Sequence, residues 1–101
     1  MGGHRRRIIW SSEALADLDG IWDYYEQTAG GYAAESIVRR VFQTCAVLEE
    51  HAFAGLSRDE VRQGLRSFVT PPYVVFYRVQ DDDVPEIVRV VDERQDIEAT
   101  L

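Results

Sequence analysis

Lysine is absent from this chain of 101 residues, so all eleven basic residues are arginine and chemistry that needs a lysine amine is excluded. Cysteine occurs once, as Cys45, which excludes a disulfide within the chain and fits a reducing compartment. The two histidines, His4 and His51, are far apart in the sequence, and a metal site or a histidine base is not expected. No apolar run approaches the roughly 20 residues that span a membrane, and no secretory apolar segment follows the basic N-terminus. These absences predict a cytoplasmic protein without metal or cofactor.

Acidic residues are what the chain has in excess. Eighteen Asp and Glu against eleven Arg leave a formal net charge of −7 at pH 7. Nucleic-acid binding draws on many cationic contacts with phosphate, so this balance argues against direct binding to DNA by the chain alone. Hydrophobic residues make up 46% of the chain, enough for the core of one domain over residues 1–101.

The hydrophobic pattern predicts one strand, two helices and then three strands. They are expected at residues 7–10, 12–28, 32–50, 65–69, 73–79 and 86–91, with a loop at 51–64 and a short tail helix through Ile97. Ser11 or Ser12 is the expected helix cap, and Gly30-Gly31 is the expected turn of an antiparallel helical hairpin. The order predicts an α+β domain in which an N-terminal strand and the hairpin precede a three-stranded antiparallel meander, with the helices packed on one sheet face.

Each predicted helix carries an apolar stripe. On the first it contains Ala14, Leu15, Leu18, Ile21, Trp22 and Tyr25, and on the second Ala34, Ile37, Val38, Val41, Phe42, Cys45 and Leu48. The second stripe is wider than the roughly 100° that one packing interface needs. Cys45 is expected to be a buried, inert thiol, because free cysteines are among the most buried residue types. The acids of the first helix point in different directions, which indicates a solvated surface rather than a metal site.

Several stretches together resemble the ParE branch of the RelE/ParE toxin superfamily, also called plasmid-stabilisation toxins. Residues 9–24 resemble the opening of these toxins, residues 64–68 and 73–79 their middle strands, and residues 87–91 with 94–97 their last strand and tail. The similarity covers nearly the whole chain in order. It implies the toxin of a type II toxin–antitoxin system. ParE-like members bind DNA gyrase and trap its cleaved-DNA intermediate, whereas RelE-like members cut mRNA on the ribosome.

The chemistry of the two branches favours the gyrase inhibitor. A metal-free mRNA nuclease must transfer protons and stabilise a pentavalent phosphate, and the RelE resemblance implies lysines, arginines and a C-terminal tyrosine for this. The chain has neither Tyr nor His after residue 79, and only Arg66, Arg89 and Arg94 match basic positions of that branch approximately. Arginine stabilises charge but is a poor general base. No catalytic residue is therefore expected.

Two alternatives stay open. One is a ribosome-dependent endonuclease that uses Arg66, Arg89 and Arg94 as phosphate clamps. The other is a relative that binds antitoxin but has lost toxicity. Many family members carry His-Gly after the last strand, where this chain has Asp92-Glu93, and two acids there would repel phosphate.

The resemblance also implies a hetero-oligomer with a ParD-like antitoxin whose disordered C-terminal segment folds across the hairpin. The expected antitoxin contacts are Ile21, Tyr24, Tyr25, Val38 and Phe42, although packing into the core is an equal expectation for Ile21 and Phe42. Binding to the target is expected from Arg66, Arg78, Arg89 and Arg94. These arginines could instead be solvated or paired with nearby acids. The sequence does not decide on which face of the sheet each arginine lies, because a shift of the strand register by one residue reverses the face.

Overall fold

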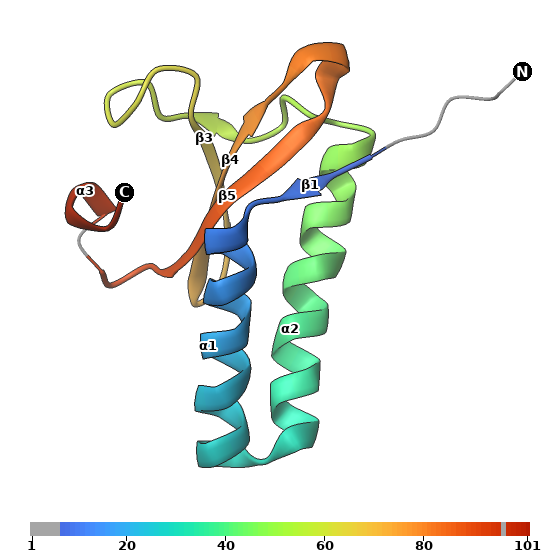
Figure 1. Cartoon of the computed structure of the whole chain (residues 1–101), viewed down its shortest axis with the longest axis vertical. Coiled ribbons are helices and arrows are strands. Elements are labelled where there is room, and N and C mark those ends of the chain that lie inside the picture. Colours follow the sequence, from blue (N-terminus) through green and yellow to red (C-terminus); the bar gives the residue numbers. More distant parts are fainter. Residues whose placement is uncertain (1–6, 96) are drawn as a thin grey trace, which may run out of the picture.

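A computed structural model describes residues 7–95 and 97–101, so His4 lies outside the described part. In chain order its elements are β1 (Ile9–Trp10), α1 (Ser12–Ala29), α2 (Gly31–Ala46), β2 (Leu56–Ser57), β3 (Arg66–Thr70), β4 (Tyr73–Val79), β5 (Pro85–Asp92) and α3 (Ile97–Thr100). The α+β prediction is confirmed: a strand and a helical hairpin precede an antiparallel meander (Figure 1).

The sheet has five strands in the order β1-β5-β4-β3-β2. The central meander β3-β4-β5 is antiparallel, and β1 joins its edge in parallel, with Ile9 opposite Glu86. The prediction of a plain loop over residues 51–64 is wrong in one place, because Leu56 and Ser57 pair with β3 as a two-residue edge strand. A strand this short carries no periodic signal in the sequence.

The N-terminus of α1 is fixed to the sheet through its capping residue. The Ser11 hydroxyl accepts a hydrogen bond from the Ala14 backbone N–H at 3.0 Å and donates one to the Val88 carbonyl at 2.9 Å. Ser11, rather than Ser12, is therefore the cap. One turn further on, the Asp17 carboxylate accepts the Val90 backbone N–H at 2.8 Å. These bonds attach α1 to the outer edge of β5.

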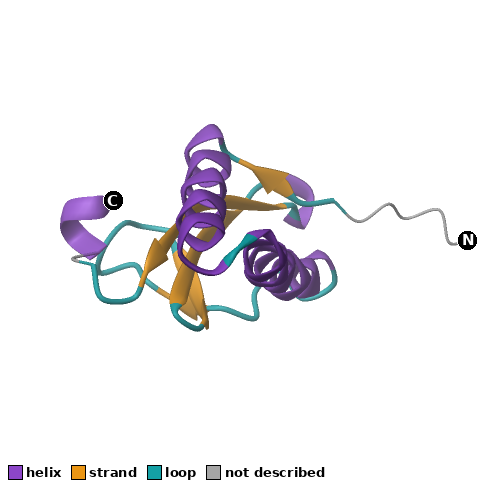
Figure 2. Ribbon diagram, turned by 90° about the horizontal axis from the view of Figure 1, so that it is seen from below, coloured by secondary structure: helices purple, strands orange, loops and turns teal. Residues whose placement is uncertain are grey.

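Two apolar clusters lie on opposite faces of the sheet. The larger lies under the hairpin and includes Leu18, Ile37, Val41, Tyr77 and Ile87. The smaller contains Leu65, Val74, Phe76 and Val91, with Ile97 and Leu101 packed against it. In the view along the hairpin, α3 lies well apart from α1 and α2 (Figure 2). Both long helices thus cover one sheet face, as predicted, while the C-terminal residues cover part of the other.

The hairpin differs from the sequence expectation in two details. Leu15, which belongs to the predicted apolar stripe of the first helix, is 47% exposed. The second helix ends at Ala46 and continues as a 3-10 turn over Val47–Glu49, which still buries Leu48. The half of the hairpin that contains the Gly30 turn extends beyond the strands (Figure 1). Within the described residues, no helix has the length and apolar character needed to cross a bilayer.

Candidate functional site

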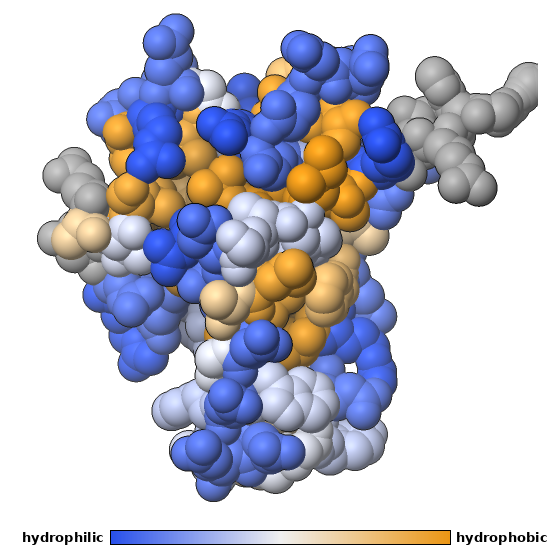
Figure 3. Space-filling model, in the orientation of Figure 1, coloured by the Kyte–Doolittle hydropathy of each residue, from blue (hydrophilic) through white to orange (hydrophobic). Residues whose placement is uncertain are grey.

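Five apolar side chains of the hairpin and β1 stay wholly or partly in contact with solvent, and we call them the hairpin outer face: Trp10, Leu15, Trp22, Val38 and Phe42. Leu15 and Phe42 are exposed, whereas the other three are half-buried, and Trp10 and Val38 also pack against the larger core cluster. Phe42 is 43% exposed, and its ring lies 4.8 Å from that of Trp10 at an angle of 55°. The side of α2 that carries Phe42 therefore lies next to the start of α1. Val38 lies one turn from Phe42 on α2, and Leu15 and Trp22 lie on the side of α1 next to its buried row. Hydrophobic surface is visible over the hairpin, with hydrophilic residues around it (Figure 3).

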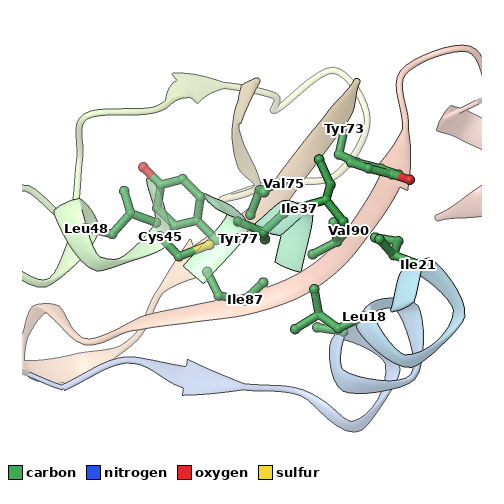
Figure 4. Packing of buried hydrophobic residues seen from close by; sticks show 12 residues of the cluster. Leu18, Ile21, Ile37, Cys45, Leu48, Tyr73, Val75, Tyr77, Ile87 and Val90 are labelled. Atoms are coloured by element: carbon green, nitrogen blue, oxygen red, sulfur yellow. The ribbon is translucent and has the colours of Figure 1, made fainter. Parts of the chain in front are cut away.

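Two of the expected antitoxin contacts are turned inward instead. Ile21 is only 7% exposed and packs with Leu18 and Val90 in the larger core cluster (Figure 4). Tyr25 is half-buried and packs against the same cluster. Ile21 and Tyr25 therefore lie beneath the surface. Val38 is likewise half-buried and packs against this cluster at the edge of the hairpin outer face, so Phe42 is the expected contact that is exposed on that face.

Tyr24 lies on a different surface. It is 60% exposed and meets Tyr25 edge-on, with ring centroids 5.2 Å apart. The two rings line a cleft of about 480 Å³ between α1 and the end of β5, together with Tyr73, Asp92 and Arg94. Burial, followed by a hydrogen bond with Tyr25, raises the pKa of Tyr73, so its phenol stays protonated. The five expected antitoxin residues thus do not form one continuous patch.

The cross-strand register decides which arginines share a face. Arg78 pairs with Glu86 and Arg89 pairs with Phe76, while Arg66 pairs with Tyr77. Paired residues point to the same side of a sheet and successive residues alternate. Arg78 and Arg89 therefore lie on the Phe76 face, and Arg66 lies on the opposite face, with Tyr77.

Arg78 and Arg89 meet in a cleft of about 390 Å³, which we call the arginine cleft, and Arg62 from the loop before β3 also lines it. Each cation already has an oxygen acceptor. Arg78 Nε donates to Glu86 at 3.0 Å, and Arg62 Nη2 donates to the Leu101 carbonyl at 2.5 Å.

Arg89 is held more firmly than the other two. Its Nε and Nη2 donate to the two carboxylate oxygens of Asp17 at 2.8 and 2.9 Å, and its Nη1 donates to the Thr100 carbonyl at 3.0 Å. The hydrogen bonds with Asp17 raise the pKa of Arg89, which stays charged wherever the protein is folded. Arg78 and Arg89 are thus paired with carboxylates, and Arg62 is bonded to a backbone carbonyl, so each of the three guanidinium groups already has an acceptor.

The remaining two arginines lie elsewhere. Arg66 Nη2 donates to the carbonyls of Phe53 and Gly55 at 3.1 and 3.0 Å, and its guanidinium lies over the Phe53 ring. Arg94 is 83% exposed and forms two bonds with the Asp92 carboxylate at 2.7 and 2.9 Å. The structure thus places Arg66, Arg89 and Arg94, the positions suggested for a phosphate clamp, in three separate environments.

Cys45 is a buried thiol. It is 1% exposed, and burial raises its pKa to about 12, so the thiolate needed for nucleophilic attack does not form near neutral pH. Among residues 7–95 and 97–101, no three His, Cys, Asp or Glu side chains are grouped so that they could hold a metal ion.

Sequence reasoning missed four residues of these surfaces. Trp10 was assigned to a strand, Leu15 and Trp22 to the apolar stripe of the first helix without a role in binding, and Arg62 to a loop of no stated role. Only the exposure of Leu15 had a signal in the sequence, because it lies at the edge of the apolar stripe, next to acidic positions. The contact of Trp10 with Phe42 spans 32 positions along the chain, and the helical period carries no information about it.

These features define a small α+β domain that presents an aromatic surface on a helical hairpin and a cleft of paired arginines. Comparison with known proteins gives its family. Residues 8–97 match the model of the ParE toxin of type II toxin–antitoxin systems, parDE, and the chain therefore belongs to this family.

Individual relatives agree with this assignment. The chain is 36% identical over 91 residues to Toxin ParE1 of Caulobacter vibrioides, covering 90% of this chain and 93% of that protein. It is 30% identical over 95 residues to Toxin ParE1 of Mycobacterium tuberculosis, covering 94% and 97%. A solved structure, described as the chromosomal ParDE TA system from P. aeruginosa, superimposes with a TM-score of 0.75 at 26% identity, covering 85% of this chain and 94% of that one.

Proposed function

We propose that this ParE toxin inhibits DNA gyrase by binding it as a protein ligand, and that an antitoxin neutralises it by covering the hairpin. The observation that carries the proposal is the match to the ParE family over residues 8–97. Gyrase acts on DNA in the cytoplasm, and we place the toxin there as well.

The arginine chemistry supports a binder over a nuclease. A ribosome-dependent nuclease needs cations free to stabilise a phosphate and a group that transfers protons. Arg66, Arg89 and Arg94 lie apart, and each is already bonded to carbonyl or carboxylate oxygens. We assign target binding to Arg78 and Arg89, which share the arginine cleft with Arg62. Arg66 and Arg94 would contact the target separately.

The antitoxin contact is assigned to the hairpin outer face, with Phe42 as its central residue. The descriptions of the family and of the P. aeruginosa structure both name a toxin–antitoxin system for the proteins they describe. An exposed aromatic ring beside a second ring provides the kind of anchor that a segment folding upon binding uses. Phe42→Asp is expected to weaken antitoxin binding while the isolated toxin keeps its circular dichroism spectrum. Unfolding of this variant would show instead that Phe42 serves the core.

The gyrase proposal is tested with purified toxin, purified gyrase, ATP and supercoiled plasmid. Linear DNA is expected to accumulate after protease treatment and to disappear when antitoxin is added. If no linear DNA forms while ribosomes cut mRNA in the presence of the toxin, the nuclease alternative replaces the proposal. If neither activity appears and expression does not arrest growth, the chain is a relative that has lost toxicity.

A further inference from the structure

The hairpin outer face leaves large apolar side chains in contact with water. Leu15 is 47% exposed and Phe42 is 43% exposed. The hairpin turn extends past the strands, so the sheet covers only part of the two helices (Figure 1). Contiguous apolar surface of this kind on a small domain marks a site for another chain.

Carboxylates border this face along α1. Asp19, Asp23 and Glu26 are all exposed, and we call them the acidic rim. Asp19 follows Leu15 by four residues and Glu26 follows Trp22 by four, so these two acids are helical neighbours of apolar members of the face. Asp23 lies one helical turn from each of these two acids. The acidic rim therefore lies beside the apolar surface.

The charge of the acidic rim is not neutralised by side chains of the described residues. Ion pairs within that part of the chain use other acids: Asp17, Glu35, Glu60, Glu86 and Asp92. On α2, Glu35 is paired with Arg39 one turn away and adds no net charge to its side of the face. The surplus negative charge thus lies on the α1 side.

Building on the proposed antitoxin contact, we infer that the hairpin outer face binds a basic amphipathic helix, whose apolar side fills the face and whose Lys or Arg residues meet Asp19, Asp23 and Glu26. A basic segment would be attracted to the acidic rim and steered by the chain's net charge of −7. An acidic segment with the same apolar anchors would meet like charges, which is how an interface rejects a wrong partner.

The test uses two synthetic peptides of about 20 residues, long enough to form a helix. Both peptides have the same leucine-rich side. The polar side carries lysine in the first peptide and glutamate in the second. Binding to the full chain is measured by fluorescence anisotropy. Three surface ion pairs are expected to make the lysine peptide bind about tenfold more tightly than the glutamate peptide. The preference is expected to shrink between about 0.05 M and 0.5 M salt, because the screening length shortens.

Two triple variants separate local from overall charge. Asp19→Asn with Asp23→Asn and Glu26→Gln removes the acidic rim, and the preference for lysine is expected to disappear. Asp81→Asn with Asp82→Asn and Asp83→Asn removes the same charge at the turn between β4 and β5, and the preference is expected to remain. Asn suits the control positions, since Asp82 and Asp83 have φ of 63° and 58° and Asn tolerates this region.

A third variant separates failure of this inference from failure of the proposed function. Phe42→Ser, checked for folding by circular dichroism, is expected to lower the affinity of the chain for both peptides. Equal binding of the two peptides, with both weakened by Phe42→Ser, would overturn the charge inference and leave the antitoxin site in place. Binding of neither peptide, or binding that Phe42→Ser does not change, would overturn the inference and the proposed antitoxin site together.

Discussion

Replacing Asp17 with alanine is expected to destabilise the fold far more than an average surface substitution. The Asp17 carboxylate accepts two hydrogen bonds from Arg89 and one from the Val90 backbone N–H, all between 2.8 and 2.9 Å. The side chains of Asp17 and Arg89 are 15% and 26% exposed. Their interaction therefore lies between that of a surface ion pair and that of a buried one.

The magnitude follows from these limits. Exposed ion pairs contribute about 0–1 kcal/mol, and breaking a fully buried pair costs about 3–5 kcal/mol. With partial exposure and a lost bond to Val90, Asp17→Ala is expected to lower the free energy of unfolding by about 2–3 kcal/mol. At about 4–8 °C per kcal/mol for a domain of this size, the melting temperature should fall by roughly 10–20 °C.

Urea unfolding followed by tryptophan fluorescence measures this loss. Glu35→Ala is the matched control, because it breaks an exposed ion pair between neighbouring turns of α2 and should cost less than about 0.5 kcal/mol. Adding Arg89→Met to Asp17→Ala should recover part of the loss, since it removes the cation left without its partner. A loss below about 0.5 kcal/mol for Asp17→Ala would refute the reasoning.

Three further predictions concern single residues. Gly55→Ala should lower the free energy of unfolding by about 1–3 kcal/mol, because the new Cβ would lie 2.7 Å from the Tyr77 ring and 2.8 Å from a backbone oxygen. Cys45, whose pKa is raised to about 12 by burial, should not react with a thiol reagent at pH 8 until the protein is denatured. The Asp92 carboxyl should titrate near pH 2 by NMR, because hydrogen bonds from Arg94 lower its pKa to about 2.

A control variant or a contradicting outcome tests each of these three predictions. At Gly20 a Cβ meets nothing within 4 Å, so Gly20→Ala in the interior of α1 should be neutral or stabilising. Thiol labelling of native protein at the rate of denatured protein would contradict the burial of Cys45. Since the folded pKa of Asp92 is lowered, its pair with Arg94 contributes fully above about pH 4 and is lost as the pH falls towards 2. In Arg94→Gln the midpoint should rise towards the ordinary value of an aspartate, but not fully, because the backbone N–H at position 94 still donates to Asp92. An unchanged midpoint would refute the assigned cause.

The long elements could be predicted because their signals are local. Helical periodicity, the cap residues before α1 and Gly30 after it placed both helices, and the β-branched run before Arg78 placed β4. The edge strand β2 could not be predicted, since two residues carry no period. The shared face of Arg78 and Arg89 also depends on a register shift between Phe76 and Tyr77, which no sequence pattern reveals.

The candidate surfaces were predicted only in part. An apolar stripe separates residues that face the sheet from those that face water only coarsely: Ile21 lies in the core, whereas Leu15, at the edge of the same stripe, is exposed. Tyr24 and Phe42 are both exposed on the hairpin, yet they lie on different surfaces because β5 borders one side of α1 and α2 the other. Such assignments depend on tertiary contacts.

The central claim is that the toxin acts as a ligand of gyrase rather than as a catalyst. The most direct measurement titrates toxin against a fixed amount of gyrase and supercoiled plasmid and quantifies linear DNA after protease treatment. A ligand predicts that linear DNA rises in proportion to added toxin and reaches a plateau once gyrase is saturated. Linear DNA that keeps accumulating with time at a small fraction of the gyrase concentration, or that forms without gyrase, would contradict the account.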